Sequence, residues 1–428
     1  MAELTTKFAG VTSPNPFWLA SAPPTNTGGQ IMRAFDAGWG GAVWKTLGKP
    51  IENVTSRFGA VDYAGKKIMG FNNIELITDR PIDVNLREMA EVKKRYPRHT
   101  LVASLMVETR EEWKTIIKQV EDVGSDAIEL NFGCPHGMCE RGMGSAVGQE
   151  PKVLEKITGW VKEFAHVPVI VKLTPNISDV TVPAEAARRA GADAVSLINT
   201  IKSIVSVDLD RFVARPSVGS KATNGGYCGP AVKPIALHMV AAIAREQSEQ
   251  HGRWLPISGI GGVSSWQDAV EFLLMGAGNV QVCTAVMHYG YRIVEDMIQG
   301  LSDYMDDKGF RSVMEITGKA VPNFTDWGSL DQKYSLVAEI HEEHCIGCNL
   351  CVVACDDGGH QCIAMSKEFR TSGPGAGHTR RAPKVDEHEC VGCNLCMLVC
   401  PSPGSITMKG IPYEKHYHSR AYKGRGAR

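Results

Sequence analysis

The chain has 428 residues, 43% of them hydrophobic, and a formal net charge of -1 at pH 7. This balance argues against bulk attraction to nucleic acid or to a membrane surface. No apolar run approaches the length of a membrane span, and the first residues, MAELTTKFAG, lack the apolar core of a signal peptide. We therefore expect a cytoplasmic protein with room for one large domain and a small module.

Short apolar runs alternate with helical patterns through most of the chain. The runs predict buried strands at 17–22, 41–46, 101–106, 127–131, 168–173, 194–199, 255–259 and 279–284. The patterns between them predict helices at 89–96, 111–123, 151–164, 182–190, 231–246 and 265–275. Eight such strands favour an α/β fold of the (β/α)8 TIM-barrel type over residues 1–307, and an open doubly wound sheet is the alternative.

In a barrel of this type, the chemistry lies at the carboxyl ends of the strands. The predicted ends carry Ala20, Ser21, Lys45, Thr46, Asn131, Lys172, Asn199, Thr200, Gly261, Gly262, Cys283 and Thr284. Either lysine alone could be a salt-bridged core residue, but two of them at the ends of apolar strands indicate an anionic or electron-rich ligand. The glycine pair before the helix at Ser265 favours a phosphate-bearing cofactor, held by backbone N–H groups and the helix N-terminus.

Several amides and glycines lie in segments that we expect to be loops. Asn73 belongs to a long loop after the second strand, and Gly229 to a glycine-rich loop at 224–230 that could approach the same cofactor. Together with Asn131 and Asn199, Asn73 could offer donors and acceptors to a planar ligand with alternating C=O and N–H groups. Each asparagine could instead be a simple turn former.

The segment 129–148, ELNFGCPHGMCERGMGSAVG, joins a polar strand end to a glycine-rich stretch. Cys134 follows the strand end by three residues, which makes it a candidate acid, base or nucleophile. The alternative is a buried structural thiol. The density of glycines predicts unusual backbone angles and a loop that moves.

Eight of the 13 cysteines form two runs near the C-terminus with the C-x2-C-x2-C-x3-C spacing. This spacing is typical of paired [4Fe–4S] clusters in which the fourth cysteine of each run serves the other cluster. One cluster would use Cys345, Cys348, Cys351 and Cys400, and the other Cys390, Cys393, Cys396 and Cys355. Zinc is the alternative metal. We expect Cys362, between the runs, to be a non-ligand.

These runs predict a small α+β ferredoxin-like domain at 336–410, joined to the barrel by a connection at 308–335. The connection between the runs, 356–389, is long and contains a glycine-rich segment at 373–377 that we expect to be exposed. The tail at 411–428 is basic, and we expect it to be disordered, with docking to a partner protein as the alternative.

Several motifs resemble one known family. The segments NFGCPHGMCERGMG, FNNIELI, VKLTPN, SLINT, GGYCGPAVKPIAL and QVCTA resemble the pyrimidine-reducing flavin domain of the dihydropyrimidine dehydrogenases, relatives of the dihydroorotate dehydrogenases. The resemblance covers nearly the whole barrel and continues into the ferredoxin module. It is strongest to the catalytic subunits of the bacterial two-subunit, NAD-dependent enzymes, because no FAD and NADPH domains of the single-chain eukaryotic form precede this barrel.

The resemblance implies FMN in the barrel, with Ser21, Lys45, Thr46, Lys172, Gly229, Gly261, Gly262, Cys283 and Thr284 as its contacts, next to Ala20. It also implies a pyrimidine held by Asn73, Asn131, Asn199 and Thr200, with Cys134 as the catalytic acid. Gly133 departs from the serine common in the single-chain enzymes, so no polar role is expected at that position.

The implied reaction is the reversible reduction of uracil or thymine to a 5,6-dihydropyrimidine in pyrimidine degradation. No G-x-G-x-x-G fingerprint follows an early strand. We therefore expect NADH to be oxidised on a partner subunit that carries FAD, with the two clusters relaying electrons and the chains forming an oligomer. The alternatives are a dihydroorotate dehydrogenase, which the CPHG segment at 134–137 fits less well, and a non-catalytic iron–sulfur electron-transfer subunit.

Overall fold

The computed structural model describes the chain except for residues 1, 64–65, 250–254, 371–378 and 413–428. It divides into two units, Met1–Phe324 and Thr325–Arg428. The segment expected to be exposed at 373–377 and the basic tail beyond residue 412 lie outside the described residues. Among the helices that are described, none combines the length and the hydropathy needed to cross a membrane.

The first unit is built on a closed barrel of parallel strands, ordered β10-β17-β18-β3-β4-β7-β8-β9. In chain order these are β3 (Phe17–Leu19), β4 (Gly41–Leu47), β7 (Thr100–Leu105), β8 (Ala127–Asn131), β9 (Val169–Lys172), β10 (Ala194–Leu197), β17 (Ile257–Ile260) and β18 (Ala277–Val282). The pairing of β18 with β3 closes the circle. The predicted eight-stranded TIM barrel is therefore confirmed, and the open sheet is excluded.

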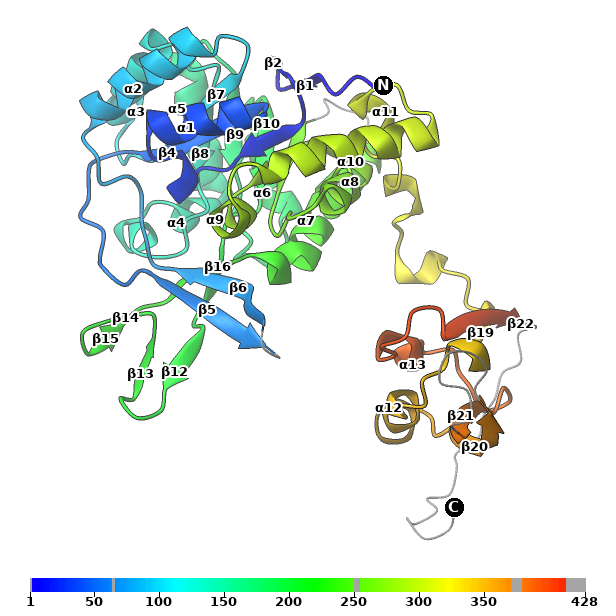
Figure 1. The fold of residues 1–428 in the computed structure, drawn as a ribbon. Coiled ribbons are helices and arrows are strands. Elements are labelled where there is room, and N and C mark those ends of the chain that lie inside the picture. The colour runs from blue at the N-terminus through cyan, green and yellow to red at the C-terminus, as the bar shows by residue number, and fades with distance from the viewer. Residues whose placement is uncertain (1, 64–65, 250–254, 371–378, 413–428) are drawn as a thin grey trace. The chain divides into compact units, whose positions relative to one another are not determined.

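Helices surround the barrel (Figure 1). They include α1 (Gly28–Ala37), α2 (Ile82–Arg95), α3 (Arg110–Asp122), α5 (Pro151–Phe164), α6 (Thr181–Arg189), α7 (Lys233–Glu249), α8 (Trp266–Leu274) and α10 (Ile293–Lys308). All six predicted helices are present. The prediction started α2 too late, at 89, because Asp83, Asn85 and Arg87 interrupt the apolar pattern before that residue. It missed α10 and also α1, which begins with two glycines that disfavour helix.

The amino end of the barrel is plugged by apolar side chains. A hairpin of β1 (Thr6–Phe8) and β2 (Val11–Ser13) precedes β3. From this hairpin Phe8 meets Trp18 edge to face, with 5.6 Å between the ring centroids. Phe8 and Trp18 pack with inward side chains of β4, β7, β8, β9 and β10. This end is therefore a packed core, and any ligand has to enter from the other end.

A polar layer lies above this plug, centred on the fully buried Glu129 of β8. Its Oε2 accepts hydrogen bonds from Ser196 Oγ at 2.8 Å and from Gln281 Nε2 at 3.3 Å. Its Oε1 lies 3.4 Å from Nζ of Lys172, which is also buried. Gln281 Nε2 also donates to Ser258 Oγ at 3.0 Å. Side chains from β8, β9, β10, β17 and β18 are thus joined across the barrel interior.

A second sheet lies at one end of the barrel (Figure 1). It is antiparallel, with the order β11 (Ile201–Ser203), β16 (Gly225–Cys228), β6 (Lys66–Asn73) and β5 (Phe58–Tyr63). Asn73 therefore ends a strand, and most of 224–230 is a strand as well, so the expectation of loops at both places is wrong. The pairing of β6 with β16 joins segments far apart in the chain, which a local pattern does not reveal.

The segment that follows α10 packs on the barrel unit. Its short helix α11 (Val313–Ile316) buries Val313 and Ile316, and Val321 beyond it is buried too. All three belong to the main core cluster of the barrel unit. The first part of the expected connection at 308–335 is thus part of the barrel unit.

The second unit is a small α+β domain, as predicted. It pairs β19 (Ser335–Ile340) with β22 (Ile406–Ile411), and β20 (Ile363–Arg370) with β21 (Thr379–Val385), both antiparallel. Two helices, α12 (Leu350–Gly358) and α13 (Leu395–Leu398), complete it. Its core cluster of buried residues contains more thiols than apolar side chains: Cys351, Cys355, Cys362 and Cys396 with Ala338, Ile363 and Ile406.

We predict that Glu129→Ala lowers the free energy of unfolding by about 3–5 kcal/mol, because it leaves the Lys172 ammonium buried without its carboxylate. Asp122→Ala is the matched control, since it removes the carboxylate of the exposed Lys118–Asp122 pair and should cost less than about 1 kcal/mol. Urea denaturation followed by circular dichroism measures both. Equal losses in the two variants would contradict a structural role for the buried pair.

Candidate active site

The barrel carries a large cavity at the carboxyl ends of its strands, with a volume of about 1260 Å³ that includes the space open to solvent. Its lining contains every barrel residue predicted as a site residue: Ala20, Ser21, Lys45, Thr46, Asn73, Asn131, Cys134, Lys172, Asn199, Thr200, Gly229, Gly261, Gly262, Cys283 and Thr284. Residues from the ends of several barrel strands and from β6 therefore face one cavity.

A chain of hydrogen bonds fixes the amides on one side of the cavity. Asn131 Nδ2 donates to Thr46 Oγ1 at 2.9 Å, and Asn199 Nδ2 donates to Asn131 Oδ1 at 2.9 Å. The backbone N–H of Thr200 then donates to Asn199 Oδ1 at 2.8 Å. Thr46 Oγ1 also lies 3.1 Å from Ser21 Oγ. These asparagines are therefore held in set orientations at the cavity wall, and they are more than turn formers.

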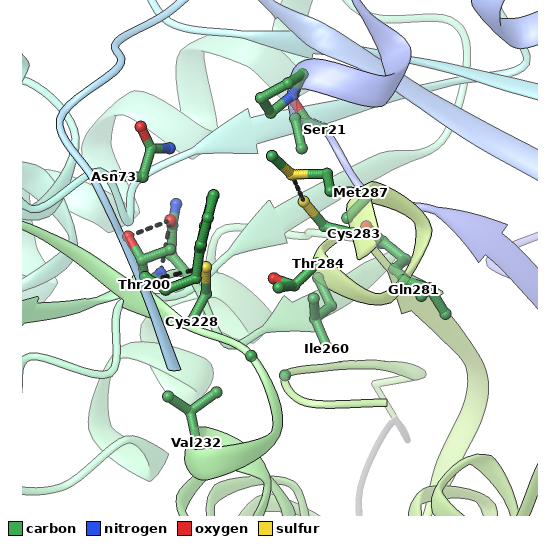
Figure 2. Close-up of a pocket in the computed structure, with 18 of the residues that line it drawn as sticks. Ser21, Asn73, Thr200, Cys228, Val232, Ile260, Gln281, Cys283, Thr284 and Met287 are labelled. Atoms are coloured by element: carbon green, nitrogen blue, oxygen red, sulfur yellow. Dashed lines mark hydrogen bonds between the residues drawn. The ribbon is translucent and has the colours of Figure 1, made fainter. Parts of the chain in front are cut away.

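Asn73 approaches the same cavity from β6. Its Oδ1 accepts a hydrogen bond from the backbone N–H of Glu75 at 2.6 Å. Figure 2 shows Asn73 and Thr200 on one side of the pocket, with Cys283, Thr284 and Met287 across from them. The antiparallel sheet thus places an amide opposite residues that come directly after the last barrel strand.

Both predicted lysines turn out to have carboxylate partners. Lys45 forms an ion pair with the buried Glu75, and Arg57 Nη1 lies 3.4 Å from the same carboxylate. Lys172 pairs with Glu129. Burial lowers the pKa of Lys45 to about 8, while the carboxylate of Asp79 favours its charged form. The alternative that each lysine forms a salt bridge is therefore confirmed, and both side chains also line the cavity.

Cys134 lies directly beyond β8 and is 9% exposed. Its Sγ donates to the carbonyl oxygen of His136 at 3.5 Å. Burial raises the pKa of the Cys134 thiol to about 11, because a thiolate is poorly solvated there. The group therefore stays protonated at neutral pH, as a proton donor must.

His136, next to this thiol, was not anticipated from the sequence. Its Nε2 lies 3.2 Å from the carbonyl oxygen of Glu75, and its buried Nδ1 has no hydrogen-bond partner among the described residues. Burial lowers the pKa of His136 to about 4, so the ring is neutral near pH 7. Its spacing from Cys134 in the glycine-rich stretch is the one signal that could have revealed it.

The glycine-rich stretch after Cys134 is packed against the cavity wall. It forms two short helices, η2 (Met138–Arg141) and α4 (Ser145–Gly148), and it buries Met138 and Met143 beside Cys134. Gly144 has a φ of +57°, and a Cβ there would lie 2.7 Å from the carbonyl oxygen of Cys134. The predicted unusual backbone angles are present, while the predicted loop motion stays a prediction.

Three glycines from two separate segments meet in the cavity lining. Gly229, Gly261 and Gly262 all have positive φ, and a Cβ on Gly262 would lie 2.9 Å from the carbonyl oxygen of Gly229. Backbone N–H groups can approach a ligand closely here. At the start of α8, however, the N–H groups of Ser264 and Ser265 already donate to Asp268 Oδ2. These two N–H groups therefore already have a partner, while the expected binding of an anion at this helix N-terminus stays a prediction.

Part of the remaining lining is apolar or sulfur-containing. Phe71 stacks on Phe58 with ring centroids 5.0 Å apart, and Cys283 Sγ lies 3.8 Å from Met287 Sδ. Cys228 Sγ donates to the carbonyl oxygen of Phe71 at 3.3 Å. The sequence pattern did not single out Phe58, Phe71, Cys228 or Met287, because apolar residues at such positions look like ordinary core. These surfaces suit the faces of planar rings.

The second unit gathers its cysteines around two smaller cavities, of about 330 Å³ and 320 Å³. The first is lined by Cys345, Cys348, Cys351 and Cys400, and the second by Cys355, Cys390, Cys393 and Cys396. In each, the fourth cysteine comes from the other run, as expected for paired clusters. Within the described residues, no three His, Cys, Asp or Glu side chains converge closely enough to hold a single metal ion.

Comparison with known proteins matches both units to characterised families. Residues 3–305 match the dihydroorotate dehydrogenase family, and residues 338–408 match the 4Fe-4S dicluster domain family. The chain is 43% identical over 372 residues to the NAD-dependent dihydropyrimidine dehydrogenase subunit PreA of Escherichia coli (strain K12), covering 86% of this chain and 89% of that protein.

Two further relatives come from other branches. The chloroplastic dihydropyrimidine dehydrogenase (NADP(+)) of Arabidopsis thaliana is 41% identical over 332 residues, covering 76% of this chain and 78% of that protein. The catalytic subunit of dihydroorotate dehydrogenase B (NAD(+)) from Pyrococcus horikoshii is 35% identical over 325 residues, covering 74% of this chain and 98% of that protein. The chain is therefore an oxidoreductase of the dihydroorotate dehydrogenase family, with a 4Fe-4S dicluster domain after its barrel.

Proposed function

We propose that the chain is the catalytic subunit of an NAD-dependent dihydropyrimidine dehydrogenase, which reduces uracil or thymine to the 5,6-dihydropyrimidine in pyrimidine degradation. The observation that carries this proposal is the buried thiol of Cys134 in the same cavity as the fixed amides of Asn131 and Asn199. The identities of 43% and 41% to two dihydropyrimidine dehydrogenases support it.

The cavity fits FMN, which relatives in this family imply. Lys45 and Lys172, with Ser21 and Thr46, would face the isoalloxazine ring, and Cys283 and Thr284 would lie beside it, next to Ala20. Gly229, Gly261 and Gly262, which meet in the cavity lining, would bring backbone N–H groups to the phosphate. When bound, FMN supplies the hydride that adds to C6 of the pyrimidine. The lysines would stabilise negative charge on the ring system.

The pyrimidine ring would be held by Asn73, Asn131, Asn199 and Thr200. Each amide side chain has both donor and acceptor atoms, which complement the alternating C=O and N–H groups of uracil. Because the hydrogen bonds among Asn131, Asn199 and Thr200 fix these side chains beforehand, little further ordering is needed when the substrate binds.

Cys134 would complete the reduction by transferring its thiol proton to C5 of the pyrimidine. The C5–C6 double bond then gains one hydride and one proton, and the thiolate that remains takes a proton from solvent. Burial disfavours the thiolate and so keeps the acid form ready. Closure of the segment 137–148 over the substrate would exclude water.

The charges of the cavity favour an uncharged pyrimidine over orotate. Among the described lining residues, the lysines are Lys45 and Lys172, each paired with a glutamate, and no arginine is present. Burial lowers the pKa of both lining histidines, His136 and His288, so neither offers a positive charge at neutral pH. An orotate carboxylate would therefore lack a free cationic partner, which makes dihydroorotate dehydrogenase activity the weaker alternative.

We further propose that electrons reach the barrel from NADH through the two [4Fe–4S] clusters. NADH oxidation would take place on a partner flavoprotein subunit that carries FAD, and the chains would assemble as an oligomer in the cytoplasm. Such a relay is chemically consistent, because each cluster transfers one electron at a time and the flavin stores the two electrons that the reduction needs. The described cysteines form no disulfide, which suits a reducing compartment.

The pKa of Cys134 gives a prediction about its reactivity. The rate at which iodoacetamide modifies Cys134, followed by peptide mass spectrometry, should keep rising above pH 8.5, about the ordinary pKa of a cysteine. It should level off only near pH 11, where burial places the pKa. A plateau near pH 8.5 would show that the thiol is exposed to water in solution and would contradict the closed geometry.

Cys134→Ala should lower the rate of uracil and thymine reduction by at least about 100-fold, because general acid catalysis contributes that much or more. Flavin and iron contents should not change. Cys139→Ala is the matched control, since Cys139 lies in the same stretch, donates to the carbonyl oxygen of Pro135 and is not part of the cavity lining. Full activity in the Cys134→Ala variant would rule out the acid role.

The purified chain alone should oxidise NADH slowly or not at all, since no nicotinamide fingerprint is present in the barrel segments. Adding the FAD-containing partner should restore NADH-dependent pyrimidine reduction. Dithionite, which delivers electrons without NADH, should support pyrimidine reduction by the chain alone. This control shows that the catalytic site of the purified chain is active. Rapid NADH oxidation by the single chain would overturn the division between subunits.

A further inference from the structure

A fifth cysteine, Cys362, lines the cavity formed by Cys355, Cys390, Cys393 and Cys396. It is only 6% exposed and directly precedes β20. Its Sγ lies 3.5 Å from the Sγ of Cys355. The cavity therefore holds one thiol more than a [4Fe–4S] cluster needs.

The backbone between Cys355 and Cys362 holds the two thiols together. The N–H of Gln361 donates to the carbonyl oxygen of Cys355 at 3.0 Å, and the N–H of Cys362 donates to the Sγ of Cys355 at 3.3 Å. Gln361 takes a positive φ of +54° in this turn. Helix α12 ends at Gly358, and the turn that follows brings Cys362 back beside the sulfur of Cys355, which lies in the last turn of that helix.

Two sulfurs this close can reach the same corner of a cluster. Iron–thiolate bonds are short, near the roughly 2.3 Å typical of metal–sulfur bonds. A movement of the Cys362 side chain by little more than the distance between the two Sγ atoms would therefore let it replace Cys355 as the iron ligand. Cys362 also contacts Cys390, which places it on the inner wall of the cavity. Among the described residues, the cavity of Cys345, Cys348, Cys351 and Cys400 has no such extra thiol.

We propose that Cys362 is an interchangeable ligand of this cluster, able to bind the iron that Cys355 binds. In the exchange, the bond from iron to Cys355 sulfur breaks and the bond from iron to Cys362 sulfur forms. The proton of the Cys362 thiol moves to the released Cys355 thiolate, so charge and electrons balance without an oxidant. The expectation that Cys362 is a non-ligand is replaced by this proposal, which does not depend on the pyrimidine reaction.

The test uses full-length chain purified without oxygen, with iron content and the electron paramagnetic resonance (EPR) spectrum of the reduced clusters as readouts. Cys355→Ala and Cys362→Ala should each keep about eight irons per chain, and the double variant about four, since each cluster holds four. Cys400→Ala is the matched control: its cavity has no fifth thiol, so this single change should lose its cluster. Loss of a cluster in Cys355→Ala or in Cys362→Ala alone would overturn the proposal.

A second pair of variants keeps the test decisive if Cys355→Ala does not fold. Cys355→Ser preserves the shape of the side chain, and serine can bind iron only through oxygen, which changes the EPR spectrum. If Cys362 takes over, Cys355→Ser should keep a spectrum with thiolate ligands only, whereas Cys355→Ser/Cys362→Ala should show the altered one. Identical altered spectra in both variants would overturn the proposal. Flavin content reports in each case that the barrel is folded.

Discussion

The buried carboxylate of Glu129 is the constraint on which the floor of the active site depends. It lies in the barrel interior, where an unpaired charge would be costly, and its partners come from three other strands. These contacts hold Lys172 and Gln281, both part of the cavity lining, above an apolar plug at the amino end. The barrel thus changes from apolar core to polar site within a short distance along its axis.

Burial also sets the chemistry at the rim. It raises the pKa of Cys134 and lowers that of His136, so that both groups are neutral near pH 7. The carboxylates of Glu75 and Glu129 balance the positive charges of the two lysines in the cavity lining. A site with little net charge, fixed amides and a protonated thiol suits an uncharged, planar, hydrogen-bonding substrate.

Much of this arrangement could be predicted from the sequence, because strand ends in a barrel converge on one rim. Lys45, Asn131, Lys172 and Cys283 each end or follow an apolar run, and all of them line one cavity. The carboxylate partners were harder to foresee. Glu129 precedes Asn131 by two residues, so the alternation along the strand points both side chains inward. The position of Glu129 within an apolar run did not reveal, however, that Lys172 is the lysine with which it pairs.

Contacts between distant segments account for what the sequence could not reveal. Asn73 was expected in a loop, yet β6 pairs with β16 more than a hundred residues later. For the cysteine runs, the regular spacing already implied which four thiols meet, whereas the closeness of Cys362 to Cys355 results from a turn with no spacing rule.

The most direct test of the central proposal is an anaerobic half-reaction. The purified chain is reduced chemically, uracil, thymine or orotate is added, and the reoxidation of the flavin is followed by absorbance. We expect uracil or thymine to reoxidise the flavin with formation of the dihydropyrimidine, which would locate catalysis in this subunit. Reoxidation by orotate alone, or by none of the three with cofactors intact, would contradict the proposed function.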